Sequence, residues 1–515
     1  MALRTLGTAS LVACVGAIAA CSAAPSATDS TEADLQNAVA PPSWDAPVER
    51  PESEAVAEAA RQGCKFTKGA MPAATLGREL PVDRDIPIKN IVVLMQENRS
   101  FDSYYGHLAK FAGRDDIESA PEDATNPEST AAADSPRHPY QHAPDLCLSD
   151  TNHEWYGAHQ EYNGGKQDGF YQANHLFAED GQPAVDPSLL SGERALWWYD
   201  ERDIPFYYSL ASTFGIGDRY FSSVMGPTWP NRDYFYAATS RGKTTNTRPD
   251  LSGLDFPAHD TVIFHELQRR KVSWEIYVDG ALPAPRIATF LSVSNVFWRY
   301  VLAGKVHGMD DFYEAARNGT LPEVSFLDGN IHEDVDGNDE HPPGDIQNGQ
   351  KLSSDIVHAL FKSPQWKDSV LFITYDENGG IYDHVAPPSA CAPDDVAPQF
   401  ETDEDKAFDA ANPGTGFEQL GFRVPITVVS PYTKKSYVSH KTYDHTSITR
   451  FIETKFKMPS LTARDANADA MLDFFDFENP PFLTPPDLPE ATIDQDRRAR
   501  CQELYPKNGV QNQTR

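Results

Sequence analysis

The chain has 515 residues, and its 76 Asp and Glu outnumber its 44 Lys and Arg, which gives a formal net charge of −32. This length is sufficient for one large α/β domain of about 400 residues with surface insertions. The acidity argues against nucleic-acid binding and against adhesion to anionic membranes through a basic patch, since both depend on clustered Lys and Arg.

The N-terminus has the pattern of an export signal. A single early cation, Arg4, precedes a run of small and apolar residues at 11–20. No later stretch approaches the ~20 apolar residues that a membrane span needs. Residues 1–21 end in the word IAAC, which resembles the bacterial lipobox. The resemblance implies cleavage before Cys21 and lipidation of its thiol; the alternative is an ordinary cleavage site with a chance cysteine.

Residues 22–60 are rich in Ala, Ser, Thr, Pro, Glu and Asp and have no sustained apolar periodicity. This composition predicts a disordered tether that leads to a single domain over 61–515. Ser22 follows the cysteine, and in Gram-negative lipoproteins this resemblance favours the outer membrane. We therefore expect an exported protein that is lipid-anchored to the cell envelope, with membrane attachment through its N-terminal lipid only, or a secreted one. The sequence does not indicate an oligomeric state.

Two apolar runs predict buried strands that end in acidic residues. Residues 91–95 are followed by Glu97 and Asn98, and residues 370–374 are followed by the pair Asp376-Glu377. In an open α/β sheet, ligands gather where the strands end. Carboxylate and amide oxygens are the ligands that a hard cation prefers. The alternative is a strand followed by a solvated loop.

The remaining pattern predicts an alternation of strands and helices with surface insertions. Further strands are expected at 272–278, 324–327 and 422–430, and helices at 202–214, 352–361 and 443–456. Insertions are expected at 111–138 and 392–411, and a proline-rich tail after 460.

Thr228 precedes a probable helix start, because Pro230 suits the first turn of a helix. Backbone N–H groups and the helix dipole favour an anion such as phosphate at that point. A hydroxyl there could attack phosphorus while the dipole stabilises the developing charge. The alternative is that Thr228 only caps the helix.

Five sequence words follow one another along the domain: QENRSFDSYYG at 96–106, MGPTWPNR at 225–232, DEHPP at 339–343, YDENGGIYDHVAPP at 375–388 and YDHTSITRFIE at 443–453. Together and in this order they resemble the bacterial phosphoesterase family of phospholipases C and acid phosphatases. The resemblance implies an α/β, alkaline-phosphatase-like sandwich, with a central mostly parallel sheet flanked by helices.

The resemblance also implies a mechanism. Thr228 would be the nucleophile, and a covalent phospho-threonine would then be hydrolysed by water. One divalent metal ion would be held by Glu97, Asn98, Asp376, Glu377 and Thr228. Its identity stays open among calcium, manganese, magnesium and zinc. The residues expected to bind phosphate oxygens or protonate the leaving alcohol are His153, His341, His384 and His445. The residues expected to contact phosphate are Asn231 and Arg232.

The resemblance favours a phospholipase C-type phosphodiesterase whose substrate is a phosphate ester, with phospholipids among the candidates. An acid phosphatase that cleaves phosphomonoesters is the alternative, because the sequence does not show how the pocket treats a second ester group. A third alternative is an inactive surface-anchored binding protein, which would be expected to have lost a metal ligand or the nucleophile. None of the matched positions is lost.

Four cysteines remain after the signal and the lipidated position are set aside: Cys64, Cys147, Cys391 and Cys501. An even number in an exported protein predicts two disulfides, for which three pairings are possible. We expect Cys147 to pair with Cys391, because each lies a few residues from a candidate active-site histidine. Cys64 would then pair with Cys501 and tie the ends of the domain together. A site of four thiolates is disfavoured, since no CxxC pair is present.

Overall fold

The computed structural model of this protein describes residues 40–178, 186–246, 262–279, 304–330 and 334–506. Within these ranges, no helix combines the length and the apolar character that crossing a membrane requires. The signal segment, Cys21 and residues 22–39 of the predicted tether lie outside the described residues.

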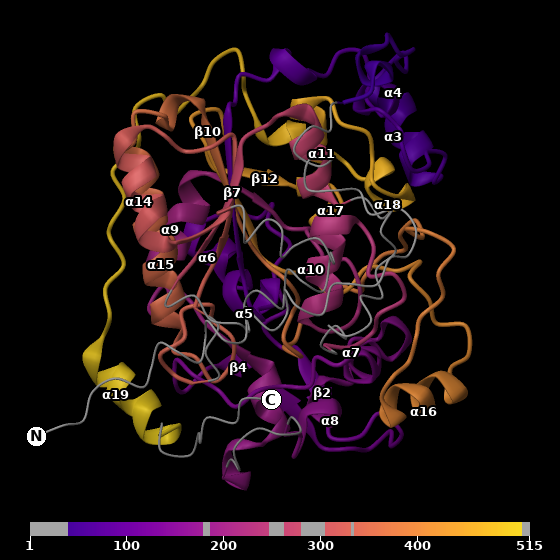
Figure 1. Cartoon of the computed structure of the whole chain (residues 1–515). Helices are drawn as coiled ribbons and strands as arrows, with labels where there is room; N and C mark the ends of the chain where they lie inside the picture. The colour runs from indigo at the N-terminus through magenta and orange to yellow at the C-terminus, as the bar shows by residue number, and fades with distance from the viewer. Residues whose placement is uncertain (1–39, 179–185, 247–261, 280–303, 331–333, 507–515) are drawn as a thin grey trace, which may run out of the picture. The chain divides into compact units, whose positions relative to one another are not determined.

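A sheet of eight strands forms the centre of the described domain (Figure 1). Its strands, in spatial order, are β12 (Tyr437–Ser439), β6 (Gly215–Gly217), β11 (Ile426–Val429), β10 (Ser369–Tyr375), β1 (Asn90–Gln96), β9 (Val324–Asp328), β7 (Trp274–Val278) and β8 (Val306–Gly308). Each neighbouring pair is parallel except the two pairs that β11 makes. The central, mostly parallel sheet expected from the sequence is thus confirmed.

The register of the central strands brings their carboxyl ends together. Gln96 of β1 lies opposite Tyr375 of β10, and Met95 lies opposite Asp328 of β9. Glu97 and Asp376, which come directly after β1 and β10, are therefore neighbours at one edge of the sheet.

Helices cover both faces of this sheet (Figure 1). On one face lie α9 (Pro205–Thr213), α14 (Met309–Asn318) and α15 (Ile346–Lys362), and on the other lie α10 (Thr228–Ala237), α11 (Ile263–Arg270) and α17 (His445–Phe456). The other helices are α3 (Glu54–Gln62), α4 (Pro72–Thr75), α5 (Phe101–Tyr105), α6 (Leu108–Ala112), α7 (Trp155–Tyr162), α8 (Phe170–Asn174), α16 (Asp403–Ala411), α18 (Ala463–Ala466) and α19 (Gln495–Leu504). Two short strand pairs, β2 (Thr125–Pro127) with β3 (Arg137–Pro139) and β4 (Gln141–His142) with β5 (Trp197–Trp198), lie outside the sheet.

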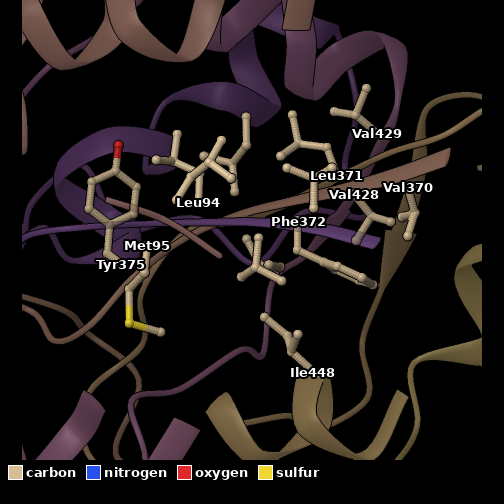
Figure 2. Close-up of a cluster of buried hydrophobic side chains, with 14 of the residues drawn as sticks. Leu94, Met95, Val370, Leu371, Phe372, Tyr375, Val428, Val429 and Ile448 are labelled. Atoms are coloured by element: carbon tan, nitrogen blue, oxygen red, sulfur yellow. The ribbon is translucent and has the colours of Figure 1, made fainter. Parts of the chain in front are cut away.

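The core is built from the apolar runs of the central strands. Figure 2 shows side chains from β1, β10 and β11 side by side, with Ile448 of α17 packed against them. The labelled strand residues, all buried, are Leu94, Met95, Val370, Leu371, Phe372, Tyr375, Val428 and Val429. Strands covered on both faces have continuous apolar sequences, which is why these runs could be recognised in the sequence.

Side-chain N-caps set the first residues of α15 and α17. α15 starts six residues earlier than expected, because the Asp345 side chain accepts the N–H of Gln347. α17 is capped by Asp444, whose side chain accepts the N–H of Thr446, while Ser447 completes a capping box.

The N-terminal segment corrects the predicted extent of the tether. Residues Pro42–Asp45 form a 3-10 turn, and α3 begins after Ser53. Trp44 is buried in the main core and lies under the guanidinium of Arg270 at 5.4 Å. Residues 40–60 are therefore part of the domain, because Trp44 and the buried face of α3, which includes Ala57, pack against it.

The disulfides pair differently from the prediction. Cys64 bonds to Cys391 and Cys147 bonds to Cys501, with Cα–Cα distances of 5.6 and 5.8 Å. The predicted pairing of Cys147 with Cys391 and of Cys64 with Cys501 is wrong, because closeness to a histidine along the chain does not bring two cysteines within bonding distance.

Candidate active site

Three carboxylates at the ends of adjacent parallel strands share one guanidinium. Arg232 of α10 pairs with Asp328 at 2.5 Å, with Glu97 at 2.9 Å and with Asp376 at 3.4 Å, measured between nitrogen and oxygen. All four side chains are at most 6% exposed. These ion pairs hold the first turns of α10 against the ends of β1, β9 and β10.

Several oxygen atoms of the predicted metal ligands are buried without a protein partner. Both polar atoms of the Asn98 side chain and Oε1 of Glu377 make no hydrogen bond to any described residue. Asp376 uses Oδ1 to accept the N–H groups of Asn98 at 3.3 Å and of Glu377 at 2.8 Å. A buried polar atom without a partner is costly, and a hard divalent cation would satisfy these oxygens. The donor set at this edge of the sheet therefore fits the expected ion.

Burial raises the pKa of two carboxyl groups at this site, those of Asp376 and Glu377. For Asp376 the charge of Glu97 adds to the effect of burial, and Arg232 opposes it. Burial raises the pKa of Glu377 well above its usual range, against the opposing effect of His153. A cation bound among these groups would favour their ionised forms.

Thr228 is the first residue of α10 and lies one turn before the guanidinium described above, on the same side of the helix. Pro227 occupies the N-cap position and makes no side-chain capping bond, and Thr228 follows it as the first helical residue, so Thr228 does not have the capping role. The N–H of Trp229 donates to Asn246 at 2.9 Å, and Pro230 has no N–H. An anion at this helix start would therefore meet the N–H of Thr228 itself and the helix dipole.

A turn of two glycines folds the segment after Glu377 against the neighbouring loops. Gly379 and Gly380 have φ values of 65° and 66°. A Cβ at Gly379 would lie 2.8 Å from the backbone oxygen of Asn98, and one at Gly380 would lie 2.8 Å from that of Asn152. Glycine meets both requirements, and the turn brings the loop that carries His153 to the acidic pair.

His153 and His341 come from separate loops, and their ring centroids lie 5.7 Å apart. Nδ1 of His153 lies 2.7 Å from the oxygen of Thr151, and Nδ1 of His341 lies 2.5 Å from that of Pro342. A carbonyl oxygen only accepts, so each Nδ1 carries the hydrogen and Nε2 is the ring atom that can meet a ligand. Asp150 joins this pair, and one ligand atom from each of the three residues lies within 4.8 Å of the others.

Asp339 connects the histidine pair to the strand-end carboxylates. Its backbone oxygen accepts the N–H of Glu97 at 2.7 Å, and its Oδ1 accepts the N–H of His341 at 3.1 Å. Its Oδ2 is buried without a hydrogen-bond partner in the described ranges. Burial lowers the pKa of His341, but Asp150 and Glu97 outweigh this effect and raise it.

His384 belongs to a second charged cluster around Arg423. Both its Nδ1 and its backbone N–H lie 2.7 Å from Oδ2 of Asp102. Arg423 bridges Asp102 and Asp383 at 2.8 Å each, and all three side chains are fully buried. Burial lowers the pKa of His384, but its hydrogen bond to the Asp102 carboxylate outweighs this and raises it. Asp102 and Arg423 thus orient the ring through Nδ1 and leave Nε2 for a ligand.

Both ring nitrogens of His445 contact protein atoms. Its Nε2 lies 2.6 Å from the backbone oxygen of Asp376, and the hydroxyl of Tyr220 lies 3.1 Å from its Nδ1. Nε2 therefore carries the hydrogen, and Nδ1 accepts the hydroxyl hydrogen. Burial lowers the pKa of His445. A ring with both nitrogens engaged by protein atoms supports the backbone at Asp376.

Asn231 and Arg232, which were expected to contact phosphate, bind protein groups in this structure. Oδ1 of Asn231 accepts the N–H of Val224 at 3.0 Å, and its Nδ2 donates to the oxygen of Gly226 at 2.9 Å. Asn231 therefore holds the loop before Thr228 in place. The guanidinium of Arg232 binds carboxylates, as described above.

Five polar residues of this site were not among those predicted: Asp102, Asp150, Asp328, Asp339 and Arg423. Asp102 and Asp339 lie within the motifs QENRSFDSYYG and DEHPP, and Asp328 follows a predicted strand. An acid at a strand end was the available signal for Asp328, as it was for Glu97 and Asp376.

Comparison with known proteins identifies a family and relatives of this chain. The profile of the Phosphoesterase family matches residues 88–459. Phospholipase C B of Mycobacterium tuberculosis is 33% identical over 441 residues, which cover 78% of this chain and 80% of that protein. Non-specific phospholipase C1 of Arabidopsis thaliana is 31% identical over 433 residues, which cover 79% of this chain and 74% of that protein.

Two solved structures align with this chain at low TM-scores. A protein of the alkaline phosphatase superfamily from Vibrio parahaemolyticus aligns with a TM-score of 0.35 and 8% identity, over 86% of this chain and 79% of that one. The lipoteichoic acid synthase LtaP from Listeria monocytogenes aligns with a TM-score of 0.34 and 10% identity, over 76% of this chain and 79% of that one.

Proposed function

The chain belongs to the phosphoesterase family, as a phosphoric ester hydrolase, and we propose that it is a phosphodiesterase of the phospholipase C type. The observation that carries this proposal is the position of Thr228. It begins α10 without a capping bond, one turn from a guanidinium that is bound to three strand-end carboxylates. A hydroxyl at a helix start beside such a cluster is suited to attack phosphorus.

In the proposed reaction, the hydroxyl of Thr228 gives its proton to a basic side chain of the site, and its Oγ1 forms a bond to phosphorus as the bond from phosphorus to the alcohol oxygen breaks. A histidine donates the proton that the leaving alcohol requires. Water then attacks the phospho-threonine, which releases a phosphate monoester and restores the hydroxyl of Thr228. The candidates for phosphate contact and proton donation are His153, His341 and His384, each of which has Nδ1 engaged by a protein acceptor.

The residues that would hold a divalent metal ion are Glu97, Asn98, Asp376 and Glu377, together with Thr228. The buried, unpartnered oxygens of Asn98 and Glu377 support this part of the proposal. When bound, the ion would lower the pKa of a coordinated hydroxyl and polarise a phosphoryl oxygen. Asp376 would be held in place by the N–H groups of Asn98 and Glu377.

A substrate panel tests the proposal directly. We expect faster turnover, measured as kcat/KM, for p-nitrophenyl phosphorylcholine and phosphatidylcholine than for p-nitrophenyl phosphate. A preference for the monoester would favour an acid phosphatase instead. Turnover of none of them, with each candidate metal added, would favour the inactive binding protein.

Export and lipid anchoring are further parts of the proposal. The run at 11–20 that ends before Cys21 supports a lipoprotein signal. Two disulfides in the described domain support an oxidising compartment. Cys21→Ala should abolish labelling by a palmitate analogue and release the protein from membranes, whereas a wild-type protein without lipid label would contradict the anchor.

A further inference from the structure

A single buried carboxylate, that of Glu340, collects hydrogen bonds from several elements beside the active site. The hydroxyl of Tyr207 donates to its Oε1 at 2.5 Å, and the hydroxyls of Tyr375 (2.9 Å) and Tyr104 donate to its Oε2. Nε2 of Gln96 also donates to Oε1 at 3.3 Å. All five side chains are at most 2% exposed. We call these five residues the Glu340 cage.

The elements around the carboxylate approach it closely. Gln96 and Tyr375 end β1 and β10, Tyr104 lies on α5 and Tyr207 lies on α9. Gly349 of α15 closes the remaining side, where a Cβ would lie 2.1 Å from Cγ of Glu340. A glycine at this helical position is disfavoured by propensity, so its presence here is explained by close contact with the carboxylate.

On one side, the cage reaches the loop that carries Glu97 and Asn98. Nε of Arg99 donates to the hydroxyl of Tyr104 at 3.3 Å, and its Nη1 donates to the backbone oxygen of Asn98 at 2.8 Å. Asn98 has a φ of 62°, in the left-handed region. Arg99 therefore connects the cage to the residue whose side-chain atoms are unpartnered.

On the other side, the cage holds the loop that carries Asp339 and His341. Glu340 lies between these two residues and has a φ of 74°. A non-glycine residue is held in this region only when its surroundings over-determine its conformation. The hydrogen bonds from the three tyrosines supply that constraint. The N–H of Glu97 donates to the oxygen of Asp339 at 2.7 Å, which joins the two loops directly.

We propose that the Glu340 cage is a positioning device that sets the two active-site loops, 97–98 and 339–341, against each other. Its catalytic consequence rests on the proposed function, but the loop geometry that it controls does not. The cage residues would act through Asn98, Asp339 and His341, because the hydrogen bonds of the carboxylate are all directed inward to the cage.

A second carboxylate in the chain provides a matched control. Asp473 accepts the hydroxyls of Tyr437 at 2.9 Å and Tyr443 at 2.6 Å, far along the chain from the two loops. Tyr437→Phe removes one phenol donor from a carboxylate, as Tyr207→Phe does in the cage. The two variants make the same chemical change, and only one of them is made in the cage.

The test compares Tyr207→Phe with Tyr437→Phe in the full chain. We expect Tyr207→Phe to lower kcat about tenfold or more while KM stays within about threefold, since misplaced groups weaken transition-state contacts more than substrate binding. Tyr437→Phe should keep kcat within about twofold, even if it lowers the Tm by as much as Tyr207→Phe does. Glu340→Gln should act in the same direction as Tyr207→Phe; if it does not fold, Tyr207→Phe decides.

A second measurement does not depend on the reaction. Amide hydrogen exchange of Glu97, whose N–H binds Asp339, should be faster in Tyr207→Phe and unchanged in Tyr437→Phe. If wild type hydrolyses no substrate, the proposed function fails, and the exchange rate of Glu97 alone tests whether the cage positions the two loops. If Tyr207→Phe changes neither kcat nor the exchange of Glu97, the cage is core packing and the proposal is overturned.

Discussion

The imidazole of His445 donates its Nε2 hydrogen to the backbone oxygen of Asp376 at 2.6 Å. The ring is fully buried, and its other nitrogen accepts the hydroxyl hydrogen of Tyr220. A histidine in the motif of an active site can therefore serve the site through the backbone of a neighbouring acid. In three other histidines, His153, His341 and His384, Nδ1 contacts a backbone or carboxylate oxygen.

Removal of the His445 ring should reduce stability more than it alters proton transfer. His445→Ala leaves the oxygen of Asp376 and the hydroxyl of Tyr220 without their partner, so the free energy of unfolding in urea should fall by about 1–3 kcal/mol. His445→Gln, which can place an N–H near Nε2, should recover part of this loss. A general acid at this position would give a different result: an unchanged stability and a lost limb of the pH–rate profile.

The Asn98 side chain offers a test of the metal site that is separate from catalysis. Its φ of 62° suits glycine, and its amide atoms make no hydrogen bond to the described residues. Asn98→Gly should therefore change the stability of the metal-free protein by no more than about 1 kcal/mol. Added metal should raise the Tm of wild type more than that of the variant, because a folded state that binds the ligand more weakly is stabilised less. An equal shift in both would exclude Asn98 as a ligand.

Thr228 should be dispensable for folding and essential for turnover. Because it makes no capping bond, Thr228→Ala should alter the free energy of unfolding by about 1 kcal/mol or less. The same change should lower kcat by about a thousandfold or more, since the covalent route is lost. Thr228→Ser should keep substantial activity. If Thr228→Ala turns over within a few-fold of wild type, water attacks phosphorus directly; mass spectrometry of a trapped intermediate would locate the phosphate.

The pair formed by His384 and Asp102 predicts a pH dependence of stability. Asp102 outweighs burial and raises the pKa of His384 in the folded protein. The stabilisation is fully present below the unfolded pKa of about 6.5, and it is lost as pH rises through the higher folded pKa. The difference in unfolding free energy between wild type and His384→Asn should thus be about 1–2 kcal/mol at pH 6 and smaller at pH 9. A difference that grows with pH would contradict this pairing.

The disulfide pairing is open to a direct chemical check. Peptide mapping without reduction should recover Cys64 joined to Cys391 and Cys147 joined to Cys501. Replacement of Cys501 by Ser should lower the free energy of unfolding by about 2–5 kcal/mol. Recovery of a peptide with Cys147 joined to Cys391 would instead restore the pairing expected from the sequence.

The parts of the fold that the sequence predicts are those that local patterns encode. β1 and β10 are buried on both faces, so their apolar runs are continuous, and the acids after them mark the site. Asp150 and Asp339 lie in loops, where no periodicity applies, and their positions depend on contacts such as that between Asp339 and Glu97. The partners of His445 and Asn231 could not be predicted for the same reason, because a motif does not say which atoms a side chain contacts.

The two disulfides overlap along the chain, since Cys147 lies between Cys64 and Cys391, and Cys501 lies beyond both. A protease that cut any one peptide bond between Cys64 and Cys501 would leave the two fragments joined by at least one bridge. A cut between Cys147 and Cys391 would leave them joined by both bridges. A nicked chain would therefore keep the size of the intact protein on a gel until a reductant was added.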